Sequence, residues 1–256
     1  MDITLDNIYN RNERLWGKQA QEALFKKHVA IIGLGGVGGY IAEALARSGV
    51  GVLTLVDFDK VAETDMNRQL PALMPNIGQP KVEIMKQRIS FINPHIEVRA
   101  RQEFCTRAMI EEIAGCGIDF AADAIDTIKS KVEIISTCKE KGIPIISSLG
   151  MGNRLKPEEI YIADISEVGG LKCPFAKHVV YQLKKIGIES GLPVAVSSEK
   201  PIKPAVQEIT LEIQQANGES TRINKRPPAS SPFVPPVAGY IIAGYIVREL
   251  IDNFLA

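Results

Sequence analysis

Hydrophobic and polar positions along the chain alternate in a way that predicts strands and helices in turn. Short apolar or alternating runs predict strands at 29–32, 50–56, 96–100, 120–126 and 142–147. Between these runs, apolar residues spaced three or four positions apart predict helices at 37–47, 81–90, 106–114 and 128–141. This order predicts a Rossmann-like α/β fold, a doubly wound and mainly parallel sheet with helices on both faces.

The pattern changes after Gly150. Strands are predicted at 160–164, 194–197 and 209–213, and a basic helix is predicted at 174–186. We interpret these segments as an antiparallel extension of the sheet in the C-terminal half. Residues 199–232 are rich in lysine, proline and serine, which predicts a mobile or crossing segment.

Glycines mark the turn between the first predicted strand and its helix. Gly33, Gly35 and Gly38 have the spacing G-x-G-x-x-G, which lets backbone N–H groups approach a phosphate at the helix N-terminus. Asp57 ends the second strand, where a carboxylate can bind both ribose hydroxyls of a nucleotide. Such glycines also occur where a helix merely packs on a sheet, so the motif alone is weak. Its strand–helix–strand setting and Asp57 favour a nucleotide site.

The segment after Asp57 is polar and has little periodicity. Asn67, Arg68 and Gln69 place several hydrogen-bond donors side by side. Lys81 begins the helix after Pro80, where a cation opposes the helix dipole unless an anion lies nearby. These donors favour a ligand rich in phosphate, although a solvated lysine is the alternative for Lys81.

Two carboxylates lie at the end of the strand predicted at 120–126. Asp123 and Asp126 fall near the carboxyl edge of the sheet, where open α/β sheets bind ligands. A strand-end carboxylate of this kind can hold Mg²⁺ beside a phosphate. We therefore expect Asp126 to be a magnesium ligand.

Two classes of nucleotide enzyme compete for these motifs. A nicotinamide dehydrogenase would use the glycines and the ribose carboxylate, but it needs no cluster of phosphate-binding donors. ATP explains that cluster, because Arg68, Lys81 and an arginine such as Arg14 can neutralise a triphosphate. The chain has no G-x-x-x-x-G-K-[ST] sequence, which excludes a P-loop protein.

These motifs together resemble those of the ubiquitin-activating-enzyme-like superfamily, which includes the bacterial ThiF, MoeB and HesA proteins. The matching segments are Gly33–Gly38, Asp57–Asp59, Asn67–Gln69, Lys81 and Asp123–Asp126. Arg14–Gly17 also looks like the N-terminal arginine segment of the superfamily, and the resemblance covers about residues 8–165. Members of the superfamily activate a carboxylate by adenylation with ATP.

The resemblance implies a role for each motif. The implied nucleotide-binding residues are Gly33, Gly35, Gly36, Gly38, Asp57, Asp59, Asn67, Arg68, Gln69 and Lys81. The implied catalytic residues are Arg14, Arg68, Lys81 and Asp126, with Asp126 holding Mg²⁺. Arg14 is expected to reach the ATP of the other subunit of a homodimer.

The second half of the chain separates two subfamilies. Sulfur-carrier adenylyltransferases usually carry two C-x-x-C pairs for structural zinc, which this sequence lacks, so no zinc is expected. The chain is instead similar to the tRNA threonylcarbamoyladenosine dehydratase family, at Leu155–Ile160, Ala163–Ser166, Val196–Glu199 and Phe233–Pro236. The alternative is a ThiF- or MoeB-type adenylyltransferase that activates the C-terminus of a small sulfur-carrier protein.

The dehydratase resemblance implies a full set of partners. The substrate would be a threonylcarbamoylated, ANN-decoding tRNA, whose modified adenosine is adenylated on its carboxylate and then closes into a ring. The implied cofactors are ATP and Mg²⁺, with a monovalent cation as a further ion. A homodimer and a cysteine desulfurase with its sulfur acceptor are the other implied partners.

Charge and the basic residues bear on tRNA binding. Thirty basic and thirty acidic residues give a net charge of +0, which argues against a generic polyanion binder but permits a local basic face. The residues available for such a face are Lys177, His178, Lys184, Lys185, Lys200, Lys203, Arg222, Lys225 and Arg226. An ordinary solvated surface is the alternative.

Cysteine usage and the termini indicate the compartment. Cys105, Cys116 and Cys138 are interpreted as packing or surface residues, and the chain opens without a signal-peptide pattern, so we expect a cytoplasmic protein. Cys173 lies near Lys172, which could lower its pKa for thioester chemistry, but a structural thiol is favoured.

The C-terminal apolar segment after Pro235 and Pro236 is expected to be too short to cross a bilayer. We interpret it as a buried core helix at about 236–254, without membrane insertion. The whole chain, 1–256, is expected to be one adenylating domain of the ThiF/MoeB type. Its predicted parts are a helical arm at 1–27, a nucleotide-binding core at 28–150 and a substrate-side extension at 151–256.

Overall fold

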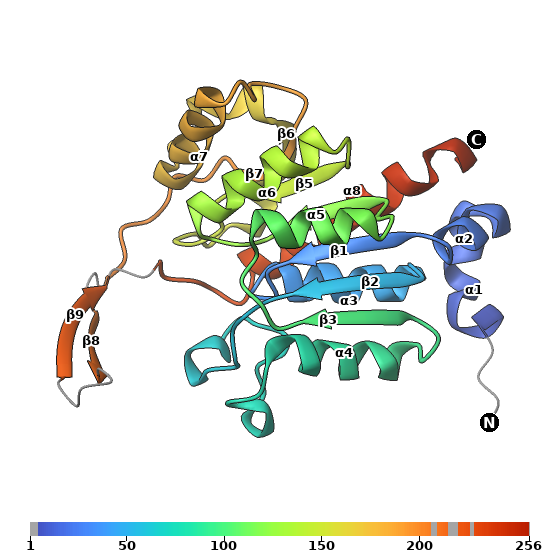
Figure 1. The fold of residues 1–256 in the computed structure, drawn as a ribbon, viewed down its shortest axis with the longest axis horizontal. Helices are drawn as coiled ribbons and strands as arrows, with labels where there is room; N and C mark the ends of the chain where they lie inside the picture. Colours follow the sequence, from blue (N-terminus) through green and yellow to red (C-terminus); the bar gives the residue numbers. More distant parts are fainter. Residues whose placement is uncertain (1–4, 206–208, 215–219, 226–227, 256) are drawn as a thin grey trace.

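The described residues, which are 5–205, 209–214, 220–225 and 228–255 of a computed structural model, form a central sheet of seven strands (Figure 1). The strands are β1 His28–Ile32, β2 Val52–Val56, β3 Glu97–Arg101, β4 Phe120–Asp123, β5 Ile145–Ser148, β6 Ile160–Asp164 and β7 Pro193–Ser197. Their order is β3-β2-β1-β4-β5-β7-β6, and β6 alone of these runs antiparallel to its neighbour. The predicted parallel sheet with an antiparallel extension is confirmed.

Helices cover both faces of this sheet (Figure 1). They are α1 Leu5–Trp16, α2 Lys18–Leu24, α3 Gly38–Ser48, α4 Lys81–Ile92, α5 Arg107–Gly115, α6 Ile128–Glu140, α7 Pro174–Lys185 and α8 Val234–Ile251. One core lies between the sheet and α2, α3, α4 and α8, and a second lies between the sheet and α5, α6 and α7. Alternate residues of β1 enter the two cores, Val29 on one side and Ala30 on the other, which explains the unbroken apolar run.

The last helix begins at Val234, two residues before its predicted start. Together with the short 3₁₀ turn η5, Asp252–Phe254, it spans 21 residues and is apolar enough to cross a membrane by length and composition. The expectation that it is too short is therefore wrong. A Cβ on Gly239 would lie 2.6 Å from the Val37 carbonyl oxygen, so α8 packs tightly on the start of α3. Because Ile242, Ala243 and Ile246 are buried as well, the helix serves the core as predicted.

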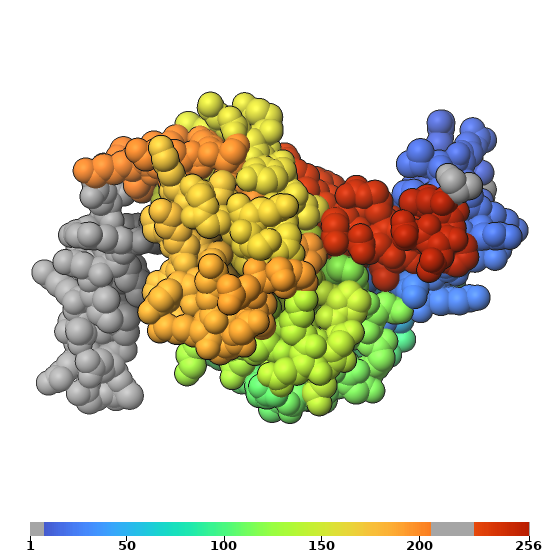
Figure 2. Space-filling view, turned by 90° about the horizontal axis from the view of Figure 1, so that it is seen from above, coloured from blue at the N-terminus to red at the C-terminus, as the bar shows by residue number. Residues whose placement is uncertain are grey.

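The N-terminal arm docks on the end of the sheet away from the strand tips. Tyr9 Oη donates to the Ala46 carbonyl oxygen over 2.9 Å, and Asn93 Nδ2 donates to Tyr9 Oη over 3.0 Å. Helices α1 and α2 both lie within the helical arm predicted at 1–27. Figure 2 shows this arm beside the end of α8, with which α2 is in contact.

A hairpin of β8, Ile209–Gln214, and β9, Ser220–Lys225, pairs only with itself in the described chain and projects from the body (Figure 1). The strand at 209–213 was predicted, and its partner was not. Of the predicted crossing segment 199–232, the parts at 206–208, 215–219 and 226–227 lie outside the described residues. Arg226 and the side chains of Arg222 and Lys225 therefore lie outside the description too.

Candidate active site

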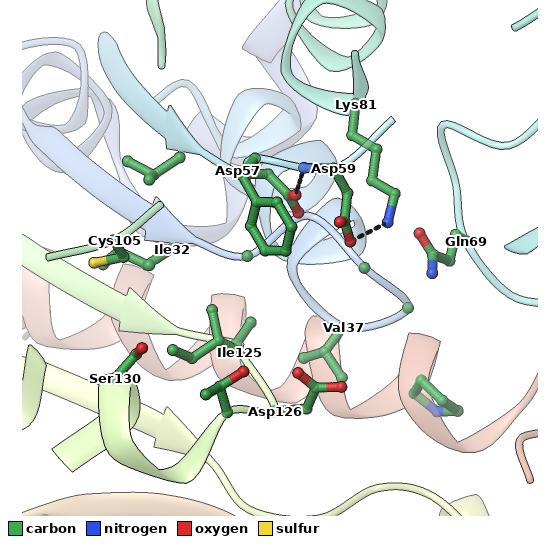
Figure 3. Close-up of a pocket in the computed structure, with 18 of the residues that line it drawn as sticks. Ile32, Val37, Asp57, Asp59, Gln69, Lys81, Cys105, Ile125, Asp126 and Ser130 are labelled. Atoms are coloured by element: carbon green, nitrogen blue, oxygen red, sulfur yellow. Dashed lines mark hydrogen bonds and ion pairs between the residues drawn. The ribbon is translucent and has the colours of Figure 1, made fainter. Parts of the chain in front are cut away.

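A cavity of about 290 Å³ opens at the carboxyl ends of β1, β2 and β4 (Figure 3). Strand β1 lies between β2 and β4, so the connections leave it in opposite directions along the sheet. Such a switch point leaves a crevice between the strand tips, which is where α/β sheets bind ligands.

The glycine turn forms its floor. Gly33, Gly35 and Gly36 line the cavity, and a Cβ added at Gly35 would meet no atom closer than 3.9 Å. Gly33 has a φ of +91°, a conformation that other residues rarely adopt. Gly38 does not line the cavity, and a Cβ there would lie 1.7 Å from the Gly33 carbonyl oxygen. Its glycine is needed to let α3 start against the turn.

Asp57 lies at the tip of β2 and is held by backbone donors. Its Oδ2 accepts a hydrogen bond from the Leu34 N–H over 2.6 Å, and its Oδ1 accepts one from the Asp59 N–H over 2.8 Å. Burial raises the pKa of the Asp57 carboxyl, while these hydrogen bonds and the charge of Lys81 oppose that rise. The fixed carboxylate is suited to accept hydrogen bonds from hydroxyl groups in the cavity.

A cluster of cations and amides lies at one end of the cavity (Figure 3). Lys81 Nζ is 3.0 Å from Asp59 Oδ2 and 3.5 Å from Asp65 Oδ2, and Lys81 is buried. Arg68 Nη2 is 3.6 Å from Asp65 Oδ1, and Gln69 Nε2 donates to the same oxygen over 2.6 Å. The anion that a helix-starting lysine requires is thus present within the protein itself.

Asp65 is the residue of this cluster that sequence reasoning missed. It is 8% exposed and contacts Arg68, Gln69 and Lys81, so it fixes three donors relative to one another. The spacing of Asp65, three and four residues before Arg68 and Gln69, is a signal that could have identified it.

Besides Gly38, two further predicted residues lie away from the cavity. Asn67 Nδ2 donates to the Ser230 carbonyl oxygen over 3.1 Å, and its Oδ1 accepts from Arg68 Nη1 over 2.8 Å. Asn67 therefore supports Arg68 rather than lining the site. Arg14 is exposed on α1, at the opposite end of the sheet (Figure 1). Its expected contact with the ATP of a second subunit stays a prediction.

The two aspartates after β4 have different environments. Asp126 is exposed, lines the cavity and faces it from the side opposite Lys81 (Figure 3). Asp123 is fully buried and forms an ion pair with Lys131, so it does not face the ligand. Among the described residues, no group of three or more His, Cys, Asp or Glu side chains could hold a metal ion alone. A single carboxylate still suits Mg²⁺, which usually keeps waters and binds substrate phosphates.

The other end of the cavity is apolar. Cys105, Ile125 and Ser130 lie there (Figure 3), and an exposed pair, Phe58 and Phe104, stacks at 3.7 Å between ring centroids beside them. Burial raises the pKa of Cys105 to about 12, so its thiol stays protonated at neutral pH. No spacing in the sequence predicted this end, because its residues come from three separate loops and from the first turn of α6.

Comparison with known proteins agrees with this geometry. The model of the ThiF family matches residues 9–251. The chain belongs to the ThiF family. This ThiF-family chain is 44% identical over 245 residues to the tRNA threonylcarbamoyladenosine dehydratase of Bacillus subtilis, covering 96% of this chain and 95% of that relative.

Solved structures extend the likeness to three dimensions. An E. coli tRNA N6-threonylcarbamoyladenosine dehydratase, crystallised in complex with ATP, matches with a TM-score of 0.84 and 26% identity, covering 99% of this chain and 98% of that one. The molybdopterin-synthase adenylyltransferase of Salmonella typhimurium is 38% identical, but over only 54% of this chain and 56% of the relative. Similarity to the dehydratases therefore includes the second half of this ThiF-family chain.

Proposed function

We propose that this chain is an ATP-dependent tRNA threonylcarbamoyladenosine dehydratase. The observation that carries the proposal is the cavity at the switch point. It joins a ribose-type carboxylate, Asp57, to a cationic cluster at Arg68 and Lys81 and to a free strand-end carboxylate, Asp126. The similarity to a named dehydratase along nearly the whole chain supports the choice of substrate.

The two ends of the cavity suggest how ATP lies in it. The adenine would occupy the apolar end near Phe58 and Ile125, with the ribose hydroxyls at Asp57. The phosphates would then run over the glycine turn toward Arg68 and Lys81. Those cations become most effective as charge develops on the phosphate oxygens during adenylation.

Asp126 is the residue that would hold Mg²⁺. It is the acidic side chain of the cavity that faces the phosphate path from the side opposite Lys81 (Figure 3). When bound, the ion would neutralise negative charge on the phosphates and on the pyrophosphate that leaves. A monovalent cation stays a prediction without a site of its own in the described residues.

The reaction balances without an enzyme nucleophile. A carboxylate oxygen of the threonylcarbamoyl group attacks the α-phosphorus, and the bond to pyrophosphate breaks. A nitrogen of the same group then attacks the activated carbonyl carbon, AMP leaves with the carboxylate oxygen, and the nitrogen loses a proton to solvent. Because the attacking nitrogen is tethered in the substrate, its effective molarity is high.

The remaining partners belong to this proposal. Helix α7 exposes Lys177, His178, Lys184 and Lys185, which could face the tRNA backbone. A homodimer would let Arg14 act on a second active site. A cysteine desulfurase system and a cytoplasmic location remain expectations from the family resemblance.

Reconstitution tests the function directly. The purified chain is incubated with ATP, MgCl₂ and threonylcarbamoylated tRNA, and the digested nucleosides are analysed by mass spectrometry. We expect a nucleoside lighter by one water, with one AMP and one pyrophosphate per product. Asp126→Ala should abolish AMP formation, whereas Asp252→Ala, which removes an exposed aspartate far along the chain, should not.

Other outcomes distinguish the alternatives. ATP–pyrophosphate exchange that requires a small protein ending in Gly-Gly, with no change in the tRNA, would show a sulfur-carrier adenylyltransferase. Binding of NAD but not of ATP, measured by calorimetry, would show a redox enzyme. Either result would replace the dehydratase proposal.

A further inference from the structure

A second cavity, of about 310 Å³, adjoins the nucleotide cavity and shares Asp126 with it. Its other walls come from the end of β5, the loop at 150–154 and the start of α7. Arg154, Cys173 and Ser148 line this second cavity and not the first. A group bound here would therefore lie next to the carboxylate at which we place the metal.

Arg154 is the cation of this second cavity, and its charge is incompletely paired. The side chain is only 4% exposed, and its Nη1 donates to the carbonyl oxygens of Gly150 and Gly152. Its Nε has no hydrogen-bond partner in the part of the chain that the structure describes. Among the described residues, no carboxylate lies within 4.0 Å of the guanidinium nitrogens. A buried charge without a counter-ion is costly, which points to an anion that arrives from outside.

The loop that carries Arg154 is held in an unusual conformation. Asn153 has a φ of +60°, which costs free energy for a residue with a side chain. Its N–H donates to the Ala229 carbonyl oxygen and its Oδ1 accepts from the Ala229 N–H, each over 2.7 Å. The Ile202 N–H donates to the Asn153 carbonyl oxygen over 2.8 Å. The guanidinium is thus fixed in place before any ligand binds.

We propose that the second cavity receives the carboxylate-bearing acceptor group and that Arg154 binds its carboxylate beside Asp126. The inference rests on the proposed function, since it names the residue that recognises the acceptor. A guanidinium and a carboxylate form a charge-assisted hydrogen bond in fixed geometry. The cation also offsets the repulsion between the incoming carboxylate and Asp126.

The same guanidinium serves both half-reactions. One carboxylate oxygen leaves Arg154 to attack phosphorus, while the other oxygen stays hydrogen-bonded to it. That second oxygen becomes the carbonyl oxygen of the adenylate. It gains negative charge when the tethered nitrogen attacks, and Arg154 stabilises that charge until AMP departs.

The test compares two forms of one ligand. Binding is measured for a threonylcarbamoylated anticodon stem-loop and for the same stem-loop with its carboxylate converted to a primary amide. We expect wild type to prefer the acid by on the order of 10- to 100-fold. In Arg154→Gln that preference should fall to near one, while the Kd for ATP stays within about twofold of wild type.

A matched control and a second variant keep the test decisive. Lys172→Gln removes an exposed cation near the start of α7 and should leave the acid preference unchanged. If Arg154→Gln does not fold, Arg154→Lys replaces it. That variant keeps the charge but loses the planar fork, so the preference should fall by about tenfold.

Two results would overturn the inference while leaving the dehydratase proposal intact. One is a full acid preference in a folded Arg154 variant. The other is a large loss of ATP affinity in that variant, which would assign Arg154 to the nucleotide phosphates. By contrast, a wild-type protein that neither binds the stem-loop nor forms the cyclic product would remove the proposed function itself.

Discussion

Lys131 and Arg154 both bring a positive charge into the interior near the ends of β4 and β5, and their surroundings differ. Lys131 Nζ is 2.6 Å from Asp123 Oδ2, 3.1 Å from Ser147 Oγ and 3.0 Å from the Ser148 carbonyl oxygen. All three of its donors are used, and both side chains of the ion pair are fully buried. Arg154 has carbonyl partners for Nη1, and its Nε has none among the residues that the structure describes.

The difference separates a structural charge from one that awaits a ligand. The Lys131 ion pair ties α6 to the tips of two strands, and so fixes the turn that presents Asp126. Arg154 contributes less to the stability of the fold, because a neutral donor could also satisfy the two carbonyl oxygens that it binds. Perturbed or unpaired charges gather at functional sites, and here the contrast identifies which of two buried cations faces chemistry.

Breaking the complete pair should have the largest effect. Lys131→Met leaves Asp123 buried without a counter-ion, so we expect the free energy of unfolding to fall by about 3–5 kcal/mol. Urea denaturation measures it. Lys129→Met, on the exposed side of the same helix, is the control and should cost little. The double variant Lys131→Met with Asp123→Leu should recover most of the loss, since apolar replacement of both ions is tolerated.

Arg154→Met belongs in the same denaturation series. It removes the charge and leaves no carboxylate behind, so its cost should stay below about 2 kcal/mol. A loss as large as that of Lys131→Met would show that the two cations play the same structural part, and the comparison would fail.

The cluster of cations and amides around Asp65 is intermediate between Lys131 and Arg154. Its cations are paired with carboxylates, but they line an open cavity. Asp65→Ala should weaken ATP binding by about tenfold, because Arg68, Gln69 and Lys81 lose their common anchor. Isothermal titration calorimetry measures it, with Glu63→Ala from the same 3₁₀ turn, η1 Glu63–Asp65, as control. Unchanged or tighter binding would mean that Asp65 competes with the phosphates rather than positioning their ligands.

The same contrast explains how much the sequence could predict. Gly33, Asp57 and Lys81 were found because each sits at a boundary between predicted elements, and short-range spacing carries that information. The sheet followed from apolar runs buried on both faces. A position near such a boundary depends on few residues, so its place at the cavity can be predicted without knowledge of the whole fold.

Residues whose partners are distant in sequence could not be found this way. Arg154 can be identified as a site residue only from the structure. There the loop at 150–154 is hydrogen-bonded to Ala229, and Arg154 lines one cavity with Cys173 and Asp126. Asp123 and Asp126 look alike in the sequence, and only the position of Lys131 shows which of them faces the cavity. Periodicity also predicted the right region for the last helix but a start two residues too late, because the helical segment begins at Val234 and takes in Pro235 and Pro236.

Asp57 is a buried acidic residue that can be compared with the two buried cations. The pH dependence of its contribution to stability is the smallest effect that we expect. Burial raises its pKa above the ordinary value of 3.8, and backbone donors at Leu34 and Asp59 limit the rise. Between pH 3.8 and the raised pKa of the folded state, the native state binds more protons than the unfolded state. The stability contributed by Asp57 is therefore full below pH 3.8 and is lost as the pH rises through the folded pKa.

Asp57→Asn cannot ionise, so it should lack this loss. The free energy of unfolding of wild type, relative to that of Asp57→Asn, should fall as the pH rises from 3.8 through the raised pKa, and should then level off. Urea denaturation from pH 3.5 to pH 7, on the order of half-unit steps, follows it. A relative stability that instead rises with pH would show that the fold stabilises the ionised form of Asp57. Asp57 would then resemble Lys131, whose charge is fully paired, rather than Arg154, whose charge is not.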